Sequence, residues 1–232
     1  MKKEEVANYV RNRNKKLTEY NFQHFSVIIT DFLPDNIDIR FVFKEIESLF
    51  PEHFLELIDV IYVGDFSFFK SRKINAMYSD GAMYLSNSQD NHDDIKDDIV
   101  HELAHAIEDK YGDYLYYDDN IKEEYFSKLK KLKNYLSFEN YDFRGIDFFN
   151  EEYNSQFDEF LMNAVGYERL SNFTKNIFLS PYSATSLREN FAVGFEEFFI
   201  GDRVYLKSLC PYLYNKLYLL ANNSEETQDY EY

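Results

Sequence analysis

Short apolar runs bounded by turn residues predict strands in the first third of the chain. Phe25 to Thr30 and Asp59 to Val63 are typical of strands, because β-branched and aromatic residues dominate them. Ile74 to Tyr78 and Ala82 to Leu85 predict two more strands, and Ser79-Asp80-Gly81 between them is typical of a hairpin turn. These four segments predict a small sheet near the N-terminus.

Apolar positions at helical spacing cover most of the remaining chain. The expected helices span residues 3–20, 38–57 with a break near Pro51, and 93–111, followed after Gly112 by 119–137, 150–165, 167–175, 185–200 and 202–219. Strands that come early and helices that follow predict an α+β fold. We expect one domain over 1–221, with a sheet-bearing half of about 1–112 and a helical C-terminal half of about 113–221. Residues 222–232 are expected to form an acidic disordered tail.

The composition fits a globular protein that does not bind nucleic acid. Hydrophobic residues make up 45% of the chain, which is enough for a core, and the net charge of −17 repels phosphate backbones. The single cysteine, Cys210, excludes an internal disulfide and is expected to be a buried structural thiol. We find no signal peptide and no apolar run long enough to span a membrane, so the expected location is the cytoplasm, or association with a phage or virus.

The basic segment at the N-terminus allows two interpretations. Its charges, Lys2, Lys3, Arg11, Arg13, Lys15 and Lys16, suit a solvated helix face or a docking arm. Of the five histidines, His24, His53 and His92 stand isolated in the sequence, and we expect them to be ordinary structural residues.

The remaining two histidines form the motif His101-Glu102-Leu103-Ala104-His105. Residues four apart lie on one face of a helix, so His101 and His105 can present two imidazoles to one metal ion. Glu102 lies about 100° further round the helix and can accept a proton from water without being a ligand. The motif predicts a zinc site, with one Zn²⁺ per chain and Glu102 as general base.

A catalytic zinc site needs a third protein ligand, and no further histidine follows His105 at a suitable spacing. A carboxylate from a later helix is the economical choice, and Glu189 is the best candidate because small Ala192 lies one turn after it. Ser186-x-x-Glu189 is also a capping-box pattern, which would make Glu189 a device for starting a helix. The sequence leaves both interpretations open, and Glu151, Glu159 and Glu196 are weaker ligand candidates.

These residues resemble the catalytic domain of anthrax lethal factor and the smaller Pro-Pro endopeptidases, which are zinc metallopeptidases of the gluzincin type. The helix His101-Glu102-x-x-His105-Ala106-x-Glu108-Asp109 and the segment Glu189-x-Phe191-Ala192 are similar to the two ligand-bearing helices of that family. Tyr182, seven residues before Glu189, lies where the family has a catalytic tyrosine.

The resemblance implies a zincin-like metallopeptidase domain, with a sheet edge strand beside the active-site helix. His101, His105 and Glu189 would bind zinc, and Tyr182 would donate a hydrogen bond to the oxyanion. Gly81 to Asn87 would be the edge strand, so that a polypeptide substrate binds extended along Ala82–Leu85.

The chain departs from that family in two ways. The stretch between His105 and Glu189 is longer and holds extra helices, roughly 119–175, and there is no secretion signal, so substrate preference does not carry over. We therefore expect a zinc-dependent endopeptidase. The alternatives are a zinc hydrolase of another amide or ester, and a catalytically silent binding or structural module with a zincin fold.

Overall fold

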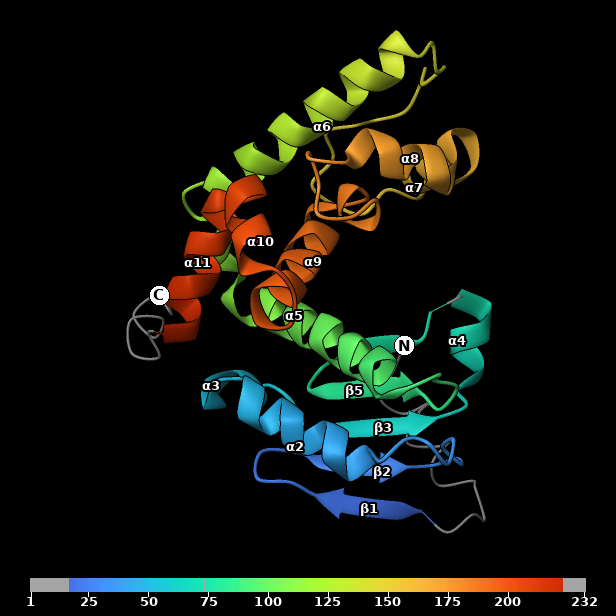
Figure 1. Ribbon diagram of the computed structural model, residues 1–232, viewed down its shortest axis with the longest axis vertical. Helices are drawn as coiled ribbons and strands as arrows, with labels where there is room; N and C mark the ends of the chain where they lie inside the picture. Colours follow the sequence, from blue (N-terminus) through green and yellow to red (C-terminus); the bar gives the residue numbers. More distant parts are fainter. Residues whose placement is uncertain (1–16, 73, 223–232) are drawn as a thin grey trace. The chain divides into compact units, whose positions relative to one another are not determined.

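The structure is a computed structural model that describes residues 17–72 and 74–222. The chain folds into two compact units, Met1–Ala106 and Ile107–Tyr232. All five described strands lie in the first unit, and helices make up the second, which confirms the α+β class (Figure 1). The basic residues of the N-terminal segment and the acidic tail from residue 223 onward lie outside the described part of the chain.

The sheet of the first unit is mixed and has the order β1-β2-β3-β5-β4. Its strands are β1 (Thr18–Asn21), β2 (Ser26–Ile29), β3 (Val60–Gly64), β4 (Ala76–Ser79) and β5 (Ala82–Ser86). The pairs β2·β3 and β3·β5 are parallel, whereas β1·β2 and β4·β5 are antiparallel. The β4–β5 turn has positive φ at Asp80 (50°) and Gly81 (78°), the geometry of a two-residue hairpin.

This order corrects the expectation that Ala82–Leu85 is an edge strand. β5 pairs with β3 on one side and with β4 on the other, so an extended peptide cannot add to it. The two edges of the described sheet are β1 and β4. The short apolar runs and the turn between them identified the hairpin, but they do not encode which of its two strands meets a third strand.

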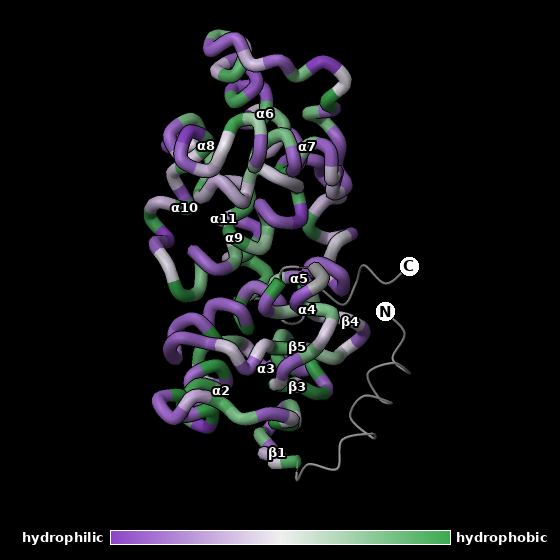
Figure 2. Tube along the Cα trace, turned by 90° about the vertical axis from the view of Figure 1, so that its right-hand side faces the viewer, coloured by the Kyte–Doolittle hydropathy of each residue, from purple (hydrophilic) through white to green (hydrophobic). Residues whose placement is uncertain are grey.

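The sheet buries both of its faces. One face carries fully buried side chains, over which α2 (Ile39–Leu49) and the first part of α5 (His92–Tyr116) lie in Figure 1: Val27, Ile61, Val63, Met83 and Leu85. On the other face Tyr84 and Ala82 pack against Phe66 and Phe69. Figure 2 accordingly shows hydrophobic colour along β3 and β5.

The helices of the first unit begin where the sequence supplies caps. Asp38 accepts hydrogen bonds from the backbone N–H groups of Arg40 and Phe41 and starts α2. Helix α3 (Glu52–Leu55) follows Pro51, at the expected break. The Asn91 side chain accepts from the N–H groups of Asp93 and Asp94 at the start of α5. This helix stays regular until Tyr111, where φ −110° and ψ 16° mark a kink.

The second unit contains a succession of helices. They are α6 (Asn120–Phe138), α7 (Ser155–Glu159), the π-helix η1 (Phe160–Gly166), α8 (Tyr167–Thr174), the 3-10 helix η2 (Tyr182–Ala184), α9 (Leu187–Phe199), α10 (Arg203–Leu209) and α11 (Pro211–Asn222). Helix α9 packs against α6, α10 and α11. A Cβ added at Gly194 would meet Leu213 Cδ2 at 2.3 Å, so a side chain there would require the Leu213 side chain in α11 to shift.

Three local expectations were wrong. Residues 18–21 form β1 rather than the end of a helix over 3–20, whose earlier part lies outside the described residues. Helix α4 (Ser67–Arg72) was not predicted, and the helix expected over 202–219 divides into α10 and α11 at Cys210-Pro211. Proline lacks an N–H group and restricts the residue before it, which explains that break. Within the described part of the chain, no helix combines the length and apolar character that crossing a membrane requires.

Candidate metal centre

Helix α5 presents the two histidines of the HExxH motif on one face, as their spacing predicts. Their ring centroids lie 4.8 Å apart at an interplanar angle of 89°. Ile99, Leu103 and Ile107 recur every four residues along this helix, and each is fully buried. His105 is also buried, whereas His101 is half-buried. The helix therefore fixes the imidazoles through core packing on its opposite side.

Glu102 is buried and forms a direct hydrogen bond with the sheet. Its Oε2 accepts a hydrogen bond of 2.6 Å from the backbone N–H of Tyr78, in the edge strand β4. A backbone donor cannot change rotamer, so this bond holds the carboxylate beside β4. The motif predicts that Glu102 is a base, whereas the contact with Tyr78 depends on the tertiary fold.

Glu189 lies in the first turn of α9, the helix that was predicted to carry it. Ser186 caps this helix, and its hydroxyl accepts a hydrogen bond of 3.1 Å from the Glu189 backbone N–H. The backbone N–H of Glu189 thus takes part in the cap, whereas a metal ion would be bound by its carboxylate. The two interpretations of Ser186-x-x-Glu189 therefore concern different atoms of one residue.

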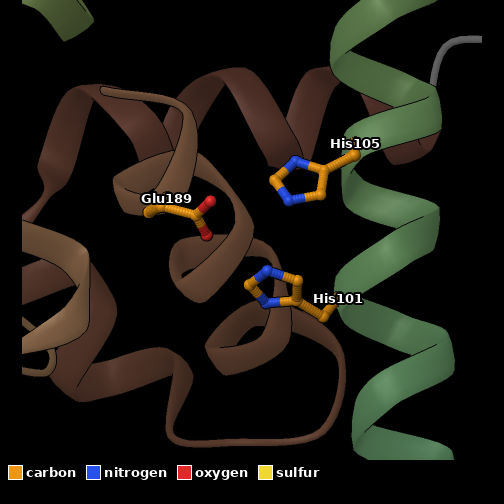
Figure 3. Close-up of side chains that lie close together, drawn as sticks. All are labelled: His101, His105 and Glu189. Carbon is orange, nitrogen blue, oxygen red and sulfur yellow. The ribbon is translucent and has the colours of Figure 1, made fainter. Parts of the chain in front are cut away.

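The carboxylate of Glu189 forms a cluster with the imidazoles of His101 and His105. One ligand atom from each of His101, His105 and Glu189 lies within 4.8 Å of the other two (Figure 3). Figure 3 shows the carboxylate and both rings directed toward a common point. Two neutral imidazoles and one carboxylate are a ligand set that catalytic zinc sites use, so these residues fit a zinc ion.

A charged network in the second unit joins the first turn of α9 to α5. Arg188 Nη1 lies 2.6 Å from Asp109 Oδ1 and 3.4 Å from Glu108 Oε2. Asp109 and Glu108 lie on the same regular stretch of α5 as His105, because the kink comes only at Tyr111. Arg188, the neighbour of Glu189, therefore joins the first turn of α9 to the part of α5 that lies in the second unit.

Glu108 is the buried member of this network. Burial raises the pKa of its carboxyl, although the hydrogen bond from Tyr116 and the charge of Arg188 lower it. The Tyr116 hydroxyl donates to Glu108 Oε1, and burial together with that carboxylate raises the pKa of Tyr116 well above its usual range. The sequence pattern identifies Glu108 and Asp109 as an acidic pair, but it does not identify Arg188 or Tyr116 as their partners.

Tyr182, which the family resemblance marks as a candidate catalytic tyrosine, lies in η2, shortly before α9. Its side chain is 47% exposed, and its carbonyl accepts hydrogen bonds from the N–H and the hydroxyl of Thr185. These bonds fix the backbone at Tyr182, and the catalytic role of its phenol stays a prediction.

A second tyrosine near Glu189, Tyr153, was not predicted from the sequence to lie at the site. Burial, the hydrogen bond to Asp158 and nearby carboxylates that include Glu189 raise its pKa to about 12. Its phenol therefore stays protonated at neutral pH, within the electrostatic reach of Glu189.

The weaker ligand candidates fall outside this centre. Among the described residues, the groups able to hold a metal do not include Glu151, Glu159 or Glu196. Glu151 instead pairs with Lys122 at 3.1 Å. Cys210 is fully buried, as expected for a structural thiol, and burial raises its pKa although nearby Lys128 lowers it.

Comparisons of the chain with protein-family models, curated proteins and solved structures find no match. A functional assignment therefore rests on the chemistry of the site itself.

Proposed function

We propose that this chain is a zinc-dependent endopeptidase of the gluzincin type, with a zincin-like fold. The observation that carries the proposal is the grouping of His101, His105 and Glu189 within 4.8 Å, with Glu102 next to the first ligand on the same helix. These three residues would hold the zinc ion, which would supply a Lewis acid for activating water and polarising the scissile carbonyl group. A tetrahedral zinc ion with three protein ligands would keep its fourth coordination position open for water or substrate, as catalytic zinc sites require.

Glu102 is the general base in this proposal. Its carboxylate accepts the proton of the attacking water and delivers it to the leaving amine. The N–H of Tyr78 holds one oxygen of the carboxylate, which restricts the other to a narrow range of positions. Tyr182, on the fixed backbone of η2, donates its hydroxyl to the oxyanion.

The contact between Glu102 and Tyr78 also favours a polypeptide substrate. Strand β4 is an edge of the described sheet, so an extended peptide can add to it through backbone hydrogen bonds. A peptide in that position would run beside Glu102. This arrangement replaces the binding mode along Ala82–Leu85, which the strand order excludes.

The test combines zinc content with peptide hydrolysis. After extensive dialysis the wild-type chain is expected to retain one zinc at this site, and His101→Gln is expected to lose it. Glu102→Gln should retain zinc and keep an acceptor for the Tyr78 N–H, yet lose hydrolysis by a factor of about 10² to 10⁴, because a base has been removed.

Glu123→Gln is the matched control, since Glu123 is an exposed glutamate on α6. It should leave both zinc content and hydrolysis unchanged. A peptide library and a panel of small amides and esters should be assayed side by side. Hydrolysis of small amides or esters without peptide cleavage would reject the endopeptidase proposal in favour of another zinc hydrolase, and full activity of Glu102→Gln would reject its mechanism.

A further inference from the structure

We infer that the first unit contains a second binding site for a divalent transition-metal ion, formed by His24, Glu52 and Glu56. One ligand atom from each of these residues lies within 4.8 Å of the other two. None of them belongs to the HExxH centre, and the inference does not depend on the proposed peptidase activity. His24 looks isolated in the sequence because its two carboxylate neighbours are distant along the chain.

The three residues come from two neighbouring segments. His24 lies in the turn between β1 and β2, which a hydrogen bond of 3.0 Å from the Phe22 N–H to the Phe25 carbonyl closes. Glu52 begins α3 and Glu56 ends it, and the Glu56 N–H donates to the Glu52 carbonyl at 3.0 Å. Residues one turn apart share a helix face, so both carboxylates are on the side that meets His24.

The core holds these ligands in place. Phe25, next to His24, is buried, and its ring packs against those of Phe22 and Phe43. Phe54 and Leu55, between the two glutamates, are buried as well. The backbone on both sides of the site is therefore ordered by packing, and a metal ion would not have to order it.

The His24 and Glu52 side chains lie close enough for a small rotation to bring both onto one metal ion. His24 Nδ1 lies 4.0 Å from Glu52 Oε1, beyond hydrogen-bonding distance. Two ligands bound to one tetrahedral zinc at about 2.0–2.2 Å lie roughly 3.3–3.5 Å apart. The Glu52 side chain is 68% exposed and can rotate by the small amount required, whereas the His24 side chain is 11% exposed and is already placed.

The ligand set indicates which ions would bind. One imidazole and two carboxylates suit Zn²⁺ and Mn²⁺, whereas Mg²⁺ and Ca²⁺ favour oxygen ligands. Both glutamates are exposed, so this site should bind zinc more weakly than the buried HExxH centre and should lose it on dialysis. A bound ion would link the β1–β2 turn to α3 and so stabilise the first unit.

The test is a zinc titration of four proteins by equilibrium dialysis: wild type, His24→Gln, His101→Gln and the double variant. At saturating zinc we expect two ions per chain in wild type, one in each single variant and none in the double variant. His101→Gln removes the first centre, so its remaining ion reports on His24 alone, whatever the outcome for peptidase activity. Zinc should also raise the melting temperature of His101→Gln but not that of the double variant.

His53→Gln is the matched control. His53 neighbours Glu52 in sequence but packs its ring against Phe54 at 4.4 Å, so the variant should still bind two ions. If His24→Gln does not fold, Glu52→Gln combined with Glu56→Gln, which keeps the imidazole, should lose the same ion. A His101→Gln protein that binds no ion at saturation, or a His24→Gln protein that binds as many ions as wild type, would overturn the inference and leave a plain histidine–glutamate contact.

Discussion

Arg188 donates a hydrogen bond to Asp109, with 2.6 Å between Nη1 and Oδ1. The bond ties the residue before Glu189 to the helix that carries the two histidines. Both side chains are substantially exposed, 44% and 51%, so water screens the pair and its contribution to stability is small, about 0.2–1 kcal/mol. Its main effect is to fix the position of the first turn of α9, which contains Glu189.

Arg188→Gln is therefore expected to weaken zinc binding more than it weakens the fold. Loss of an orienting contact near a metal ligand typically costs about 10-fold or more in metal affinity. Competition with a chromophoric chelator measures that affinity, and thermal unfolding of the zinc-free protein measures stability. Arg144→Gln is the control, because Arg144 forms an exposed ion pair of the same length, 2.6 Å, with Asp142. Equal zinc affinity in the two variants would contradict the positioning role of Arg188.

Glu189→Ala separates the ligand role from the capping role. If the carboxylate is a ligand, the variant loses zinc, while its backbone N–H can still donate to Ser186. Ser186→Ala is the converse change and should cost about 0.5–2 kcal/mol of stability with zinc retained. Elemental analysis and denaturant unfolding of both variants give the answer. A Glu189→Ala protein with full zinc content and only lowered stability would assign the residue to the cap alone.

Tyr182→Phe tests the oxyanion donor. The change removes one hydroxyl from a half-exposed side chain, so packing and zinc content should be preserved. Because the donor acts mainly in the transition state, kcat should fall by about 10²–10³ while KM changes little. Steady-state kinetics on any cleaved peptide measures both constants. Tyr167→Phe, at an exposed tyrosine of α8, is the control, and near-native turnover in Tyr182→Phe would refute the role.

Glu108→Gln tests the pH dependence of stability. Burial raises the pKa of Glu108 in the folded chain, so the folded state holds this proton more tightly than the unfolded state does. That stabilisation is complete below the ordinary glutamate pKa and is lost as the pH rises through the raised pKa. The unfolding free energy of wild type relative to Glu108→Gln should therefore fall as the pH rises across this window.

Denaturant unfolding of both proteins, freed of metal by a chelator, supplies the comparison at a series of pH values. All other ionisable groups are the same in the two proteins, so their contribution cancels in the difference. A difference that rises with pH would mean that Arg188 and Tyr116 lower the pKa of Glu108 by more than burial raises it.

The sequence by itself determined the local features of this protein. The spacing of His101 and His105 placed both imidazoles on one face of α5, because a helix returns to the same side every three to four residues. Short apolar runs bounded by turn residues located β2, β3 and the β4–β5 hairpin, and Ser186 marked the start of α9. Each of these patterns depends on residues within one or two turns of each other, and local backbone geometry decides them.

The tertiary structure alone decided which distant residues meet. It brought the carboxylate of Glu189 to the two imidazoles, the N–H of Tyr78 to Glu102, and His24 to Glu52 and Glu56. It also placed β5 inside the sheet, although the hairpin pattern fits either strand at the edge. Periodicity tells which side of a strand or helix is buried, but the partner on that side is chosen by packing between elements that are remote in the chain.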